Sequence, residues 1–386
     1  MGERTGMDNA RDMLVRLWRA GVAAVEGRQA VAHALDAAPV PRPDLVLAVG
    51  KAAVPMARAA LDRFGRVPAL AVTKHGHGDG HGDGQAGHDG QAGLEVIEAG
   101  HPLPDAGSLR AGAALLERVA ACPPGSHLLL LISGGASALA EAPVAGLTLD
   151  DLAAETRALI ASGADIATMN ARRRQLSRIK GGRLLQAFGG ARVTVLAISD
   201  VQGDDIAVIG SGTGLVPEGA GFAHETRIVA SNAVARAAVA AEAQTLGLTV
   251  QGNAENLYCD VGEAAAMIGA RLRAGPPGLW IWGGEPTVVL PETPGRGGRN
   301  QALALMVARG IAGQEGAAAL IAGTDGTDGP TGAAGAFVDG ASWGPGAGAA
   351  LAAADSGTWL AANGLLFEPG PTGTNVMDLA LGLKAG

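Results

Sequence analysis

The sequence predicts an α/β protein of two domains that contains a parallel, doubly wound sheet. Short Val/Leu/Ile/Ala segments alternate with Ala-rich segments of helical length, and most of the short segments end in Gly, Ser, Asp or Lys. The 386 residues also exceed the usual size of one core, which favours two domains. Hydrophobic residues make up 48% of the chain and aromatic residues only 3%, so the core must be aliphatic.

The expected elements follow each other as helix, then repeated strand and helix. Residues 8–35 have the helical spacing of Met, Leu, Val and Ala, and residues 44–61 (DLVLAVGKAAVPMARAAL) read as strand, glycine turn and helix. Ligands of open α/β sheets bind at the carboxyl ends of strands, so the strand ends predict the site. Further strand candidates are ALAVTK (69–74), LEVIEAG (94–100), HLLLLISG (127–134), RVTVLAISD (192–200), TRIVAS (226–231), GLWIWGGE (278–285) and AALIAGTDG (318–326).

We place the domain boundary after residue 255, which gives an N-terminal domain of residues 1–255 and a C-terminal domain of residues 256–386. A short helix is expected near this point, flanked by LTVQGNAENLYCD (248–260) and RAGPPG (273–278). The division leaves the first helix able to pack on the second domain.

Composition excludes several classes of protein. The formal net charge of −8 disfavours a nucleic-acid partner, because phosphate binding requires a basic surface. Cys122 and Cys259 are too few for a disulfide framework, which indicates a reducing compartment. No signal-peptide core and no run of about 18 apolar residues occurs, so we expect a cytoplasmic protein without a membrane partner. The tract HGHGDGHGDGQAGHDGQAG (75–93) has the composition of a flexible loop, and metal binding there is left open.

The segment LLLLISGGASAL (128–139) reads as a buried strand that turns sharply into a helix. Its Ser137 lacks the second glycine of the G-x-S-x-G nucleophile elbow, and the only later histidine is His224, so a hydrolase triad is disfavoured. Glycines between a strand and a helix N-terminus instead suit an anion, since N–H groups and the helix dipole both favour negative charge. A tight turn with a capping serine is the competing interpretation.

Basic residues gather in two segments despite the acidic total. ARRRQLSRIKGGRL (171–184) indicates either an anion site or an exposed charged helix, with Lys180 near the face of its arginines. GRGGRNQALAL (295–305) places Arg296 and Arg299 among glycines directly before a helix. Glycines let a substrate approach the backbone, and arginine supplies a planar fork for carboxylate or phosphate.

Acidic residues follow two of the expected strands. AISDVQGDD (197–205) contains Asp200, Asp204 and Asp205, and IAGTDGTDGPTG (321–332) contains Asp325 and Asp328. Carboxylates at strand ends that face a phosphate hold Mg²⁺ or accept a hydroxyl proton. Asx-turns and helix caps are the alternative explanation for both segments.

Nine motifs in order carry a resemblance that covers nearly the whole chain. They are VGKAAVPMA, VTKHGH, EAGHPLPDAGS, LLISGGASAL, LSRIKGGRL, ISDVQGDD, GGRNQALAL, AGTDGTDGPTGAAGAFVDG and GPTGTNVMDL. On these motifs the sequence resembles the class II glycerate kinases, whose C-terminal region is called the MOFRL domain. The resemblance implies a Rossmann-like domain, a smaller α/β domain, and an active site in the cleft between them.

The resemblance also implies an activity and its residues. The family phosphorylates D-glycerate with ATP and Mg²⁺, usually at the 2-hydroxyl, to give 2-phosphoglycerate, and homodimer formation is left open. Expected catalytic residues are Lys51, Arg299 and Asp200, and expected substrate contacts are Ser133, Gly134, Gly135, Ser137, Arg296, Asp325 and Asn300. Expected nucleotide contacts are Lys180, Gly181, Gly182 and Asn375, with Asp200 and Asp325 holding Mg²⁺ through the nucleotide.

Two departures from the family pattern bear on the site. Ala136 stands where a third glycine is usual, and its methyl group is expected to narrow the phosphate loop; GSGTGLVP (210–217) replaces the usual SGP segment. Two other functions remain as alternatives.

A hydroxypyruvate reductase requires a nicotinamide site, and no G-x-G-x-x-G opens a strand-to-helix unit here. A non-catalytic glycerate-binding protein would have no need of the catalytic residues.

Overall fold

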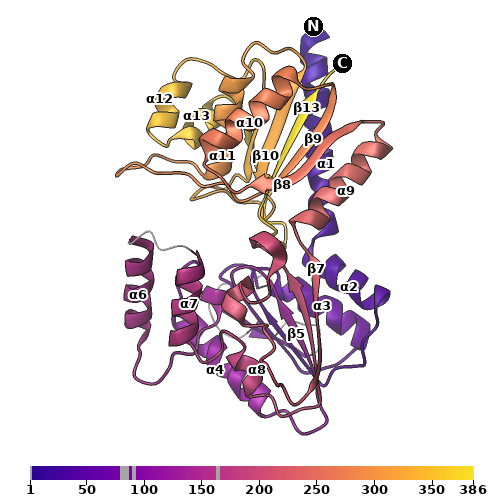
Figure 1. The fold of residues 1–386 in the computed structure, drawn as a ribbon, viewed down its shortest axis with the longest axis vertical. Coiled ribbons are helices and arrows are strands. Elements are labelled where there is room, and N and C mark those ends of the chain that lie inside the picture. Colours follow the sequence, from indigo (N-terminus) through magenta and orange to yellow (C-terminus); the bar gives the residue numbers. More distant parts are fainter. Residues whose placement is uncertain (1, 79–86, 89–92, 162–165) are drawn as a thin grey trace. The chain divides into compact units, whose positions relative to one another are not determined.

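The structure is a computed structural model that describes residues 2–78, 87–88, 93–161 and 166–386 (Figure 1). The chain forms two compact units. Unit 1 comprises Met1–Val25, Asn232–Thr372 and Val376–Gly386, and unit 2 comprises Glu26–Ser231 and Gly373–Asn375. Most of the His/Gly tract, and with it the question of a metal there, lies outside the described residues.

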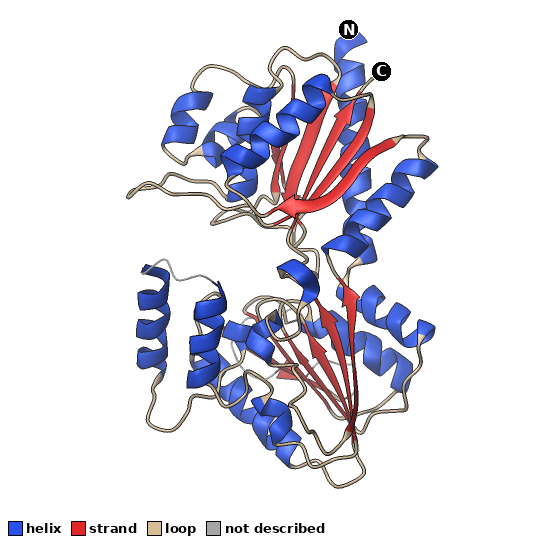
Figure 2. Cartoon of the chain, in the orientation of Figure 1, coloured by secondary structure: helices blue, strands red, loops and turns tan. Residues whose placement is uncertain are grey.

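Unit 2 is built on a sheet of seven strands in the order β3-β4-β2-β1-β5-β6-β7. The strands are red and the helices blue in Figure 2. Every pairing is parallel except that of β3 with β4. The strands are β1 (Leu45–Val49), β2 (Ala69–Lys74), β3 (Gly87–His88), β4 (Leu94–Ala99), β5 (His127–Ile132), β6 (Arg192–Ile198) and β7 (Ala223–Ala230). This sheet confirms the predicted parallel arrangement.

Helices cover both faces of the unit 2 sheet. Leu47 and Val49 of β1 point to one face and pack in a core that includes residues of α4, α5 and α8. The alternate residues Val46 and Ala48 are also fully buried, and α3 packs against β1, β2 and β5. The helices of this unit are α2 (Gly27–Ala37), α3 (Ala53–Phe64), α4 (Ala106–Ala120), α5 (Ala136–Leu139), α6 (Leu149–Ala161), α7 (Ile166–Leu176) and α8 (Arg183–Gln186).

Unit 1 contains a six-stranded mixed sheet in the order β12-β11-β10-β13-β9-β8. Only β8 and β9 pair in parallel, so the sheet here is not the parallel one that strand–helix alternation suggested. The chain reaches β11, β12 and β13 through turns and short helices, which permit antiparallel neighbours. The strands are β8 (Val250–Leu257), β9 (Gly278–Gly284), β10 (Ala317–Gly323), β11 (Gly335–Asp339), β12 (Leu366–Phe367) and β13 (Asp378–Lys384).

Helices pack on the unit 1 sheet as well. One core joins the sheet to α10 and α11, while α1 packs against α9, β10 and β13. The helices are α1 (Gly2–Ala24), α9 (Asn232–Thr245), α10 (Val261–Ala274), α11 (Arg299–Gly310), α12 (Ala347–Ala352) and α13 (Ser356–Ala362). None of the helices in the described ranges has the length and apolar character needed to cross a bilayer.

The passage of the chain from one unit to the other differs from the boundary expected after residue 255. The chain leaves unit 2 and enters unit 1 between Ser231 and Asn232, because α9 packs on α1 and β8 pairs with β9. Residues 232–255 therefore belong with the C-terminal sheet. The first helix also belongs to unit 1, and the short segment Gly373–Asn375 belongs to unit 2.

Candidate active site

The carboxyl ends of β1, β5 and β6 bring three predicted site segments together in unit 2. These strands are neighbours in the parallel sheet, so their carboxyl ends lie at one edge. Lys51 follows β1, residues 133–137 follow β5, and Asp200 follows β6. The Lys51 N–H donates to the Gly134 carbonyl oxygen at 2.9 Å, and the Ala52 N–H donates to Ser133 Oγ at 3.1 Å. These bonds fasten the turn that carries Lys51 to the loop after β5.

Gly134 lets an acidic and an amide side chain approach this loop. A Cβ atom at position 134 would lie 2.2 Å from Asp200 Oδ2 and 2.8 Å from Asn375 Nδ2, distances that real Cβ atoms do not show. Asn375 Nδ2 in turn donates to Asp200 Oδ2 at 3.4 Å. The structure thus brings together Gly134, Asp200 and Asn375, which were predicted from three separate motifs.

Gly135 has φ 84°, a left-handed conformation that favours glycine. A Cβ atom there would lie 3.1 Å from His101 Cδ2 and 3.3 Å from Lys51 Cγ. Lys51 and His101 therefore both border the space that a larger residue would fill. His101 was not among the expected site residues.

A pocket of about 230 Å³ lies beside the same loop, and its lining includes His101, Ser137 and Asp200. Ser137 Oγ lies 2.8 Å from Ser211 Oγ, and Ser211 Oγ donates to Asn170 Oδ1 at 2.9 Å. Ser211 and Asn170 also line the pocket, and Ser211 has φ 56°, which is unusual for a residue other than glycine. Three polar side chains thus form a hydrogen-bonded chain at the pocket wall.

Lys180 lines this pocket in a buried ion pair with Glu141. Burial lowers the pKa of Lys180, and the Glu141 carboxylate opposes that shift. The expectation that Lys180 shares a helical face with the nearby arginines is wrong, because α7 ends at Leu176. Within the same basic segment Arg173 lines the pocket while Arg178 is exposed.

Gly181 and Gly182 adopt left-handed backbone conformations, with φ 60° and 81°. Their N–H groups donate to the carbonyl oxygens of Ser211 and Gly212 at 3.0 and 2.9 Å. These two N–H groups hold the segment that carries Ser211, so they support the pocket wall. Their contact with a nucleotide stays a prediction.

The narrowing of the phosphate loop that we expected from the Ala136 methyl group stays a prediction. Ala136 is fully buried and belongs to the core on the α4 side of the sheet. A Cβ atom at Gly210 would lie 2.9 Å from the Ala136 Cβ. The Ala136 methyl group therefore faces a glycine of GSGTGLVP, the other segment that differs from the family pattern. The two departures from the family pattern therefore lie against each other, with the half-buried Gly210 at the pocket wall.

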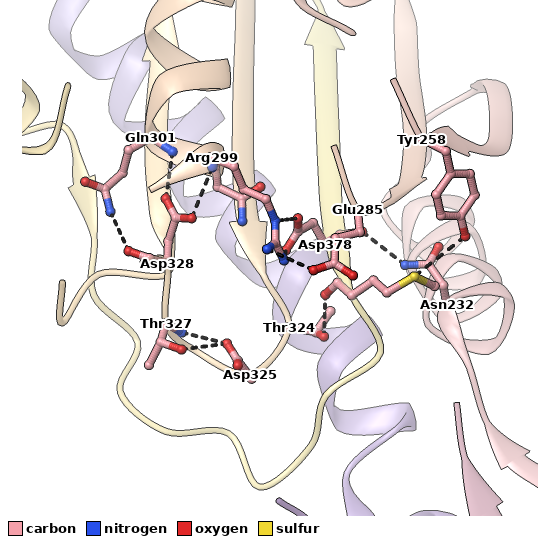
Figure 3. Close-up of polar contacts among 12 residues, drawn as sticks. Asn232, Tyr258, Glu285, Arg299, Gln301, Thr324, Asp325, Thr327, Asp328 and Asp378 are labelled. Carbon is pink, nitrogen blue, oxygen red and sulfur yellow. Dashed lines mark hydrogen bonds and ion pairs between the residues drawn. The ribbon is translucent and has the colours of Figure 1, made fainter. Parts of the chain in front are cut away.

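In unit 1, the first turn of α11 carries a second set of predicted residues (Figure 3). Arg299 donates to the buried Asp378 carboxylate from Nε at 2.6 Å and from Nη2 at 3.2 Å, and its Nη1 lies 2.9 Å from Glu285 Oε1. Burial would lower the pKa of Arg299, but Asp378 and Glu285 raise it above its ordinary value. The bidentate contact fixes the orientation of the guanidinium.

Asp328 caps the start of α11. Its two carboxylate oxygens accept the N–H groups of Asn300 at 3.1 Å and Gln301 at 2.8 Å (Figure 3). Burial raises the pKa of Asp328 to about 7, against the lowering effect of those N–H groups. A Cβ atom at Gly298 would lie 2.2 Å from the carboxyl carbon of Asp328, so the glycine before the helix makes room for this cap.

The other predicted residues of unit 1 occupy different environments. Asp325 Oδ1 accepts both the N–H and the hydroxyl of Thr327 at 2.9 Å, the Asx-turn that was the alternative explanation. The Asn300 side chain is buried, and neither of its amide atoms has a hydrogen-bond partner within the described ranges of the chain. Arg296 is exposed, and its N–H donates to Asp355 Oδ1 at 2.8 Å.

Sequence reasoning missed four polar residues that these two regions contain: His101, Glu141, Arg173 and Asp378. His101 and Asp378 lie inside the motifs EAGHPLPDAGS and GPTGTNVMDL, which is a signal that could have found them. Nothing in the sequence around Glu141 points to its pairing with Lys180. Within the described residues, no group of three or more His, Cys, Asp or Glu side chains is arranged to hold a metal ion.

Comparisons with known proteins match nearly the whole chain. One family model, a domain of unknown function (DUF4147), matches residues 13–246, and the MOFRL family model matches residues 278–378. The D-glycerate 2-kinase of Thermotoga maritima is 35% identical, with 97% of this chain and 99% of the relative covered. A putative hydroxypyruvate reductase of Agrobacterium vitis is 36% identical, with 87% of this chain and 97% of the relative covered. The crystal structure of a glycerate kinase from Thermotoga maritima matches with a TM-score of 0.84 and 32% identity, covering 98% of this chain and 100% of that one.

Proposed function

The chain belongs to the class II glycerate kinase family with a C-terminal MOFRL domain, and we propose that it transfers the terminal phosphoryl group of ATP to the 2-hydroxyl of D-glycerate. The observation that carries this proposal is the likeness to a D-glycerate 2-kinase over nearly the full length of both chains. The glycine loop after β5, with Lys51 and Asp200 against it, supports the same reaction.

Both units contribute cations suited to phosphoryl transfer. The transition state spreads negative charge over the oxygens of the migrating group, so catalysis depends on positioned positive charge. Lys51 lies in the turn before α3, where the helix dipole adds to its charge. Arg299 is held by Asp378 at the first residue of α11. In our proposal both side chains stabilise this charge, and Asp378 is the residue that positions Arg299.

Asp200 and Asp325 are the residues predicted to hold Mg²⁺. We assign Asp200 and Asp325 to the Mg²⁺ that accompanies the nucleotide, with Asp200 also the candidate acceptor of the hydroxyl proton. Mg²⁺ commonly keeps most of its ligands from phosphates and water and takes one or two carboxylates. This mode of binding is compatible with Asp200 and Asp325, which are single carboxylates at strand ends. It does not require a group of three metal-ligating side chains, and none occurs in the described part of the chain. Bound Mg²⁺ would neutralise phosphate charge.

Alanine variants of the two cations test the assignment. Lys51→Ala and Arg299→Ala should each lower kcat with D-glycerate and ATP by about a hundredfold or more, because each removes a charge contact made in the transition state. Arg66→Ala and Arg309→Ala are matched controls, since Arg66 is exposed near the end of α3 and Arg309 is exposed in the last turn of α11. Values of kcat within about threefold of the parent for both site variants, with unchanged melting, would refute their roles.

A reductase is the second candidate, because the Agrobacterium vitis relative is named a putative hydroxypyruvate reductase. The chain has no dinucleotide fingerprint between a strand and a helix, which disfavours nicotinamide binding. Incubating the protein with NADH and hydroxypyruvate and following NADH absorbance decides between the two. Oxidation of NADH at a rate comparable to phosphorylation of D-glycerate would establish the reductase instead.

A further inference from the structure

Arg173 is a half-buried guanidinium on α7 that lines the pocket of unit 2. It donates no hydrogen bond and forms no ion pair with any residue in the part of the chain that the structure describes. Burial lowers the pKa of Arg173, and the carboxylate that opposes this shift is Glu141. A partly desolvated guanidinium without a counter-ion is unfavourable unless a ligand supplies one.

Three carboxylates line the pocket, and none of them is hydrogen-bonded to Arg173. Glu141 is already paired with Lys180, so two cations share one carboxylate, and Arg173 further lowers the pKa of Lys180. Glu155 also lines the pocket, but its Oε1 accepts a hydrogen bond from Arg172 Nε at 2.5 Å. Asp200, the remaining carboxylate of the lining, lies against Gly134 and Asn375. Arg173 is therefore the cation of the lining that forms no ion pair with a described residue, and an anionic ligand would supply one.

The hydroxyl chain of the pocket has a defined direction. A serine hydroxyl has one proton to donate, and Ser211 gives its proton to Asn170 Oδ1. Ser137 must therefore donate to Ser211 across their 2.8 Å contact, which leaves the lone pairs of Ser137 Oγ as acceptors. An acceptor at a pocket wall suits a ligand that carries a hydroxyl group. The phosphate oxygens of a nucleotide are themselves acceptors and do not match it, so among the groups of a nucleotide only the ribose hydroxyls and the base amino group would.

The size of the pocket also favours a small ligand. Pockets that enclose drug-sized molecules measure about 300–1,000 Å³. The pocket beside Ser137 measures about 230 Å³, which suits a three-carbon acid better than a whole nucleotide.

We propose that this pocket of unit 2 is the D-glycerate subsite, in which Arg173 binds the substrate carboxylate and Ser137 accepts a hydrogen bond from a substrate hydroxyl. The proposal rests on the proposed function and assigns a specificity role to Arg173. A guanidinium fork matches the two oxygens of a carboxylate, so Arg173 distinguishes a hydroxy acid from a neutral polyol. The Lys180–Glu141 pair then forms a neutral part of the wall.

Steady-state kinetics of Arg173→Gln, with Arg173→Lys as a second variant, test the assignment. Arg173→Gln should raise the KM for D-glycerate about 10- to 100-fold, while the KM for ATP and kcat stay within about threefold, because the substrate carboxylate keeps its charge during the reaction and Arg173 binds it equally in the ground state and the transition state. The preference for D-glycerate over glycerol should fall by a similar factor. Arg173→Lys should give an intermediate KM, and the control Arg178→Gln removes an exposed arginine and should change none of these values.

Melting temperature and direct binding complete the test. Because Arg173 has no partner among the described residues, Arg173→Gln should melt at the parent temperature or above it. Calorimetric titration with D-glycerate alone should show the same loss of affinity, so the subsite is tested even if the parent fails to phosphorylate D-glycerate and the proposed function is wrong. An unchanged KM for D-glycerate, a rise confined to the KM for ATP, or a lowered melting temperature with both KM values unchanged would overturn the proposal.

Discussion

Removing the carboxylate of Glu141 is expected to destabilise unit 2 strongly. The Lys180 and Glu141 side chains are 2% and 4% exposed, so water cannot replace a lost partner. In the parent, Glu141 Oε1 accepts the Ala142 N–H at 2.9 Å. Glu141→Gln keeps the side-chain shape and an oxygen that can accept this bond, but it leaves the Lys180 charge unpaired. The substitution therefore isolates the electrostatic interaction.

The size of the effect follows from burial. Two unit charges about 4 Å apart attract by about 4 kcal/mol at an effective dielectric constant near 20, and a buried pair that loses one partner costs about 3–5 kcal/mol. We therefore expect Glu141→Gln to lower the free energy of unfolding by about 3–5 kcal/mol. The double variant Glu141→Gln/Lys180→Met should recover much of this loss, because neither buried charge then remains.

The assay must report on unit 2. All five tryptophans, Trp18, Trp280, Trp282, Trp343 and Trp359, lie in unit 1, so their fluorescence follows the other unit. Amide hydrogen exchange of β5 in increasing urea measures the relevant stability. As a control, Asp62→Asn removes a pair with Arg28 whose side chains are 38% and 51% exposed, and it should cost less than about 1 kcal/mol. A change below about 1 kcal/mol for Glu141→Gln as well would refute the reasoning.

Asp328 should make stability depend on pH. Its pKa is raised from 3.8 to about 7, so between these values the folded chain keeps a proton that the unfolded chain has lost, and stability falls by about 1.4 kcal/mol for each pH unit as pH rises. Urea unfolding at about pH 5 and about pH 7 gives the free energy of unfolding of the parent and of Asp328→Asn, and the difference between the two proteins should change with pH by this slope. The same difference at both pH values would contradict the prediction. Chelation by excess EDTA should abolish phosphorylation of D-glycerate and added Mg²⁺ should restore it, whereas undiminished turnover in EDTA would exclude the assigned Mg²⁺.

Local sequence signals predicted the loop after β5 well. Ser133, Gly134 and Gly135 stand between an aliphatic strand and a helix, and both strand end and turn are determined by neighbours in sequence. The same pattern placed Lys51 and Asp200 directly after strands, which the structure shows to be the two neighbours of β5, β1 and β6. Parallel order then brings these ends to one edge, which is why the predicted residues lie together in unit 2.

Tertiary pairing explains what the sequence left out. Glu141 and Lys180 are 39 positions apart, and Arg299 and Asp378 are 79 positions apart, so no local pattern joins them. The domain boundary lies before the expected residue 255 for a similar reason. β8 pairs with β9, which follows it after α10, so β8 belongs to unit 1 although β7, the strand before it in sequence, belongs to unit 2. Arg173 looked like any other residue of a basic segment, and only burial separates it from the exposed Arg178.

The identity of the phosphorylated product tests the central claim most directly. The protein, incubated with D-glycerate, ATP and Mg²⁺, should form ADP and an equal amount of 2-phosphoglycerate, identified by phosphorus and carbon NMR of the product. Formation of 3-phosphoglycerate would contradict the assigned hydroxyl. Absence of any phosphorylated product, with the protein folded and ATP and Mg²⁺ in excess, would contradict the kinase activity itself.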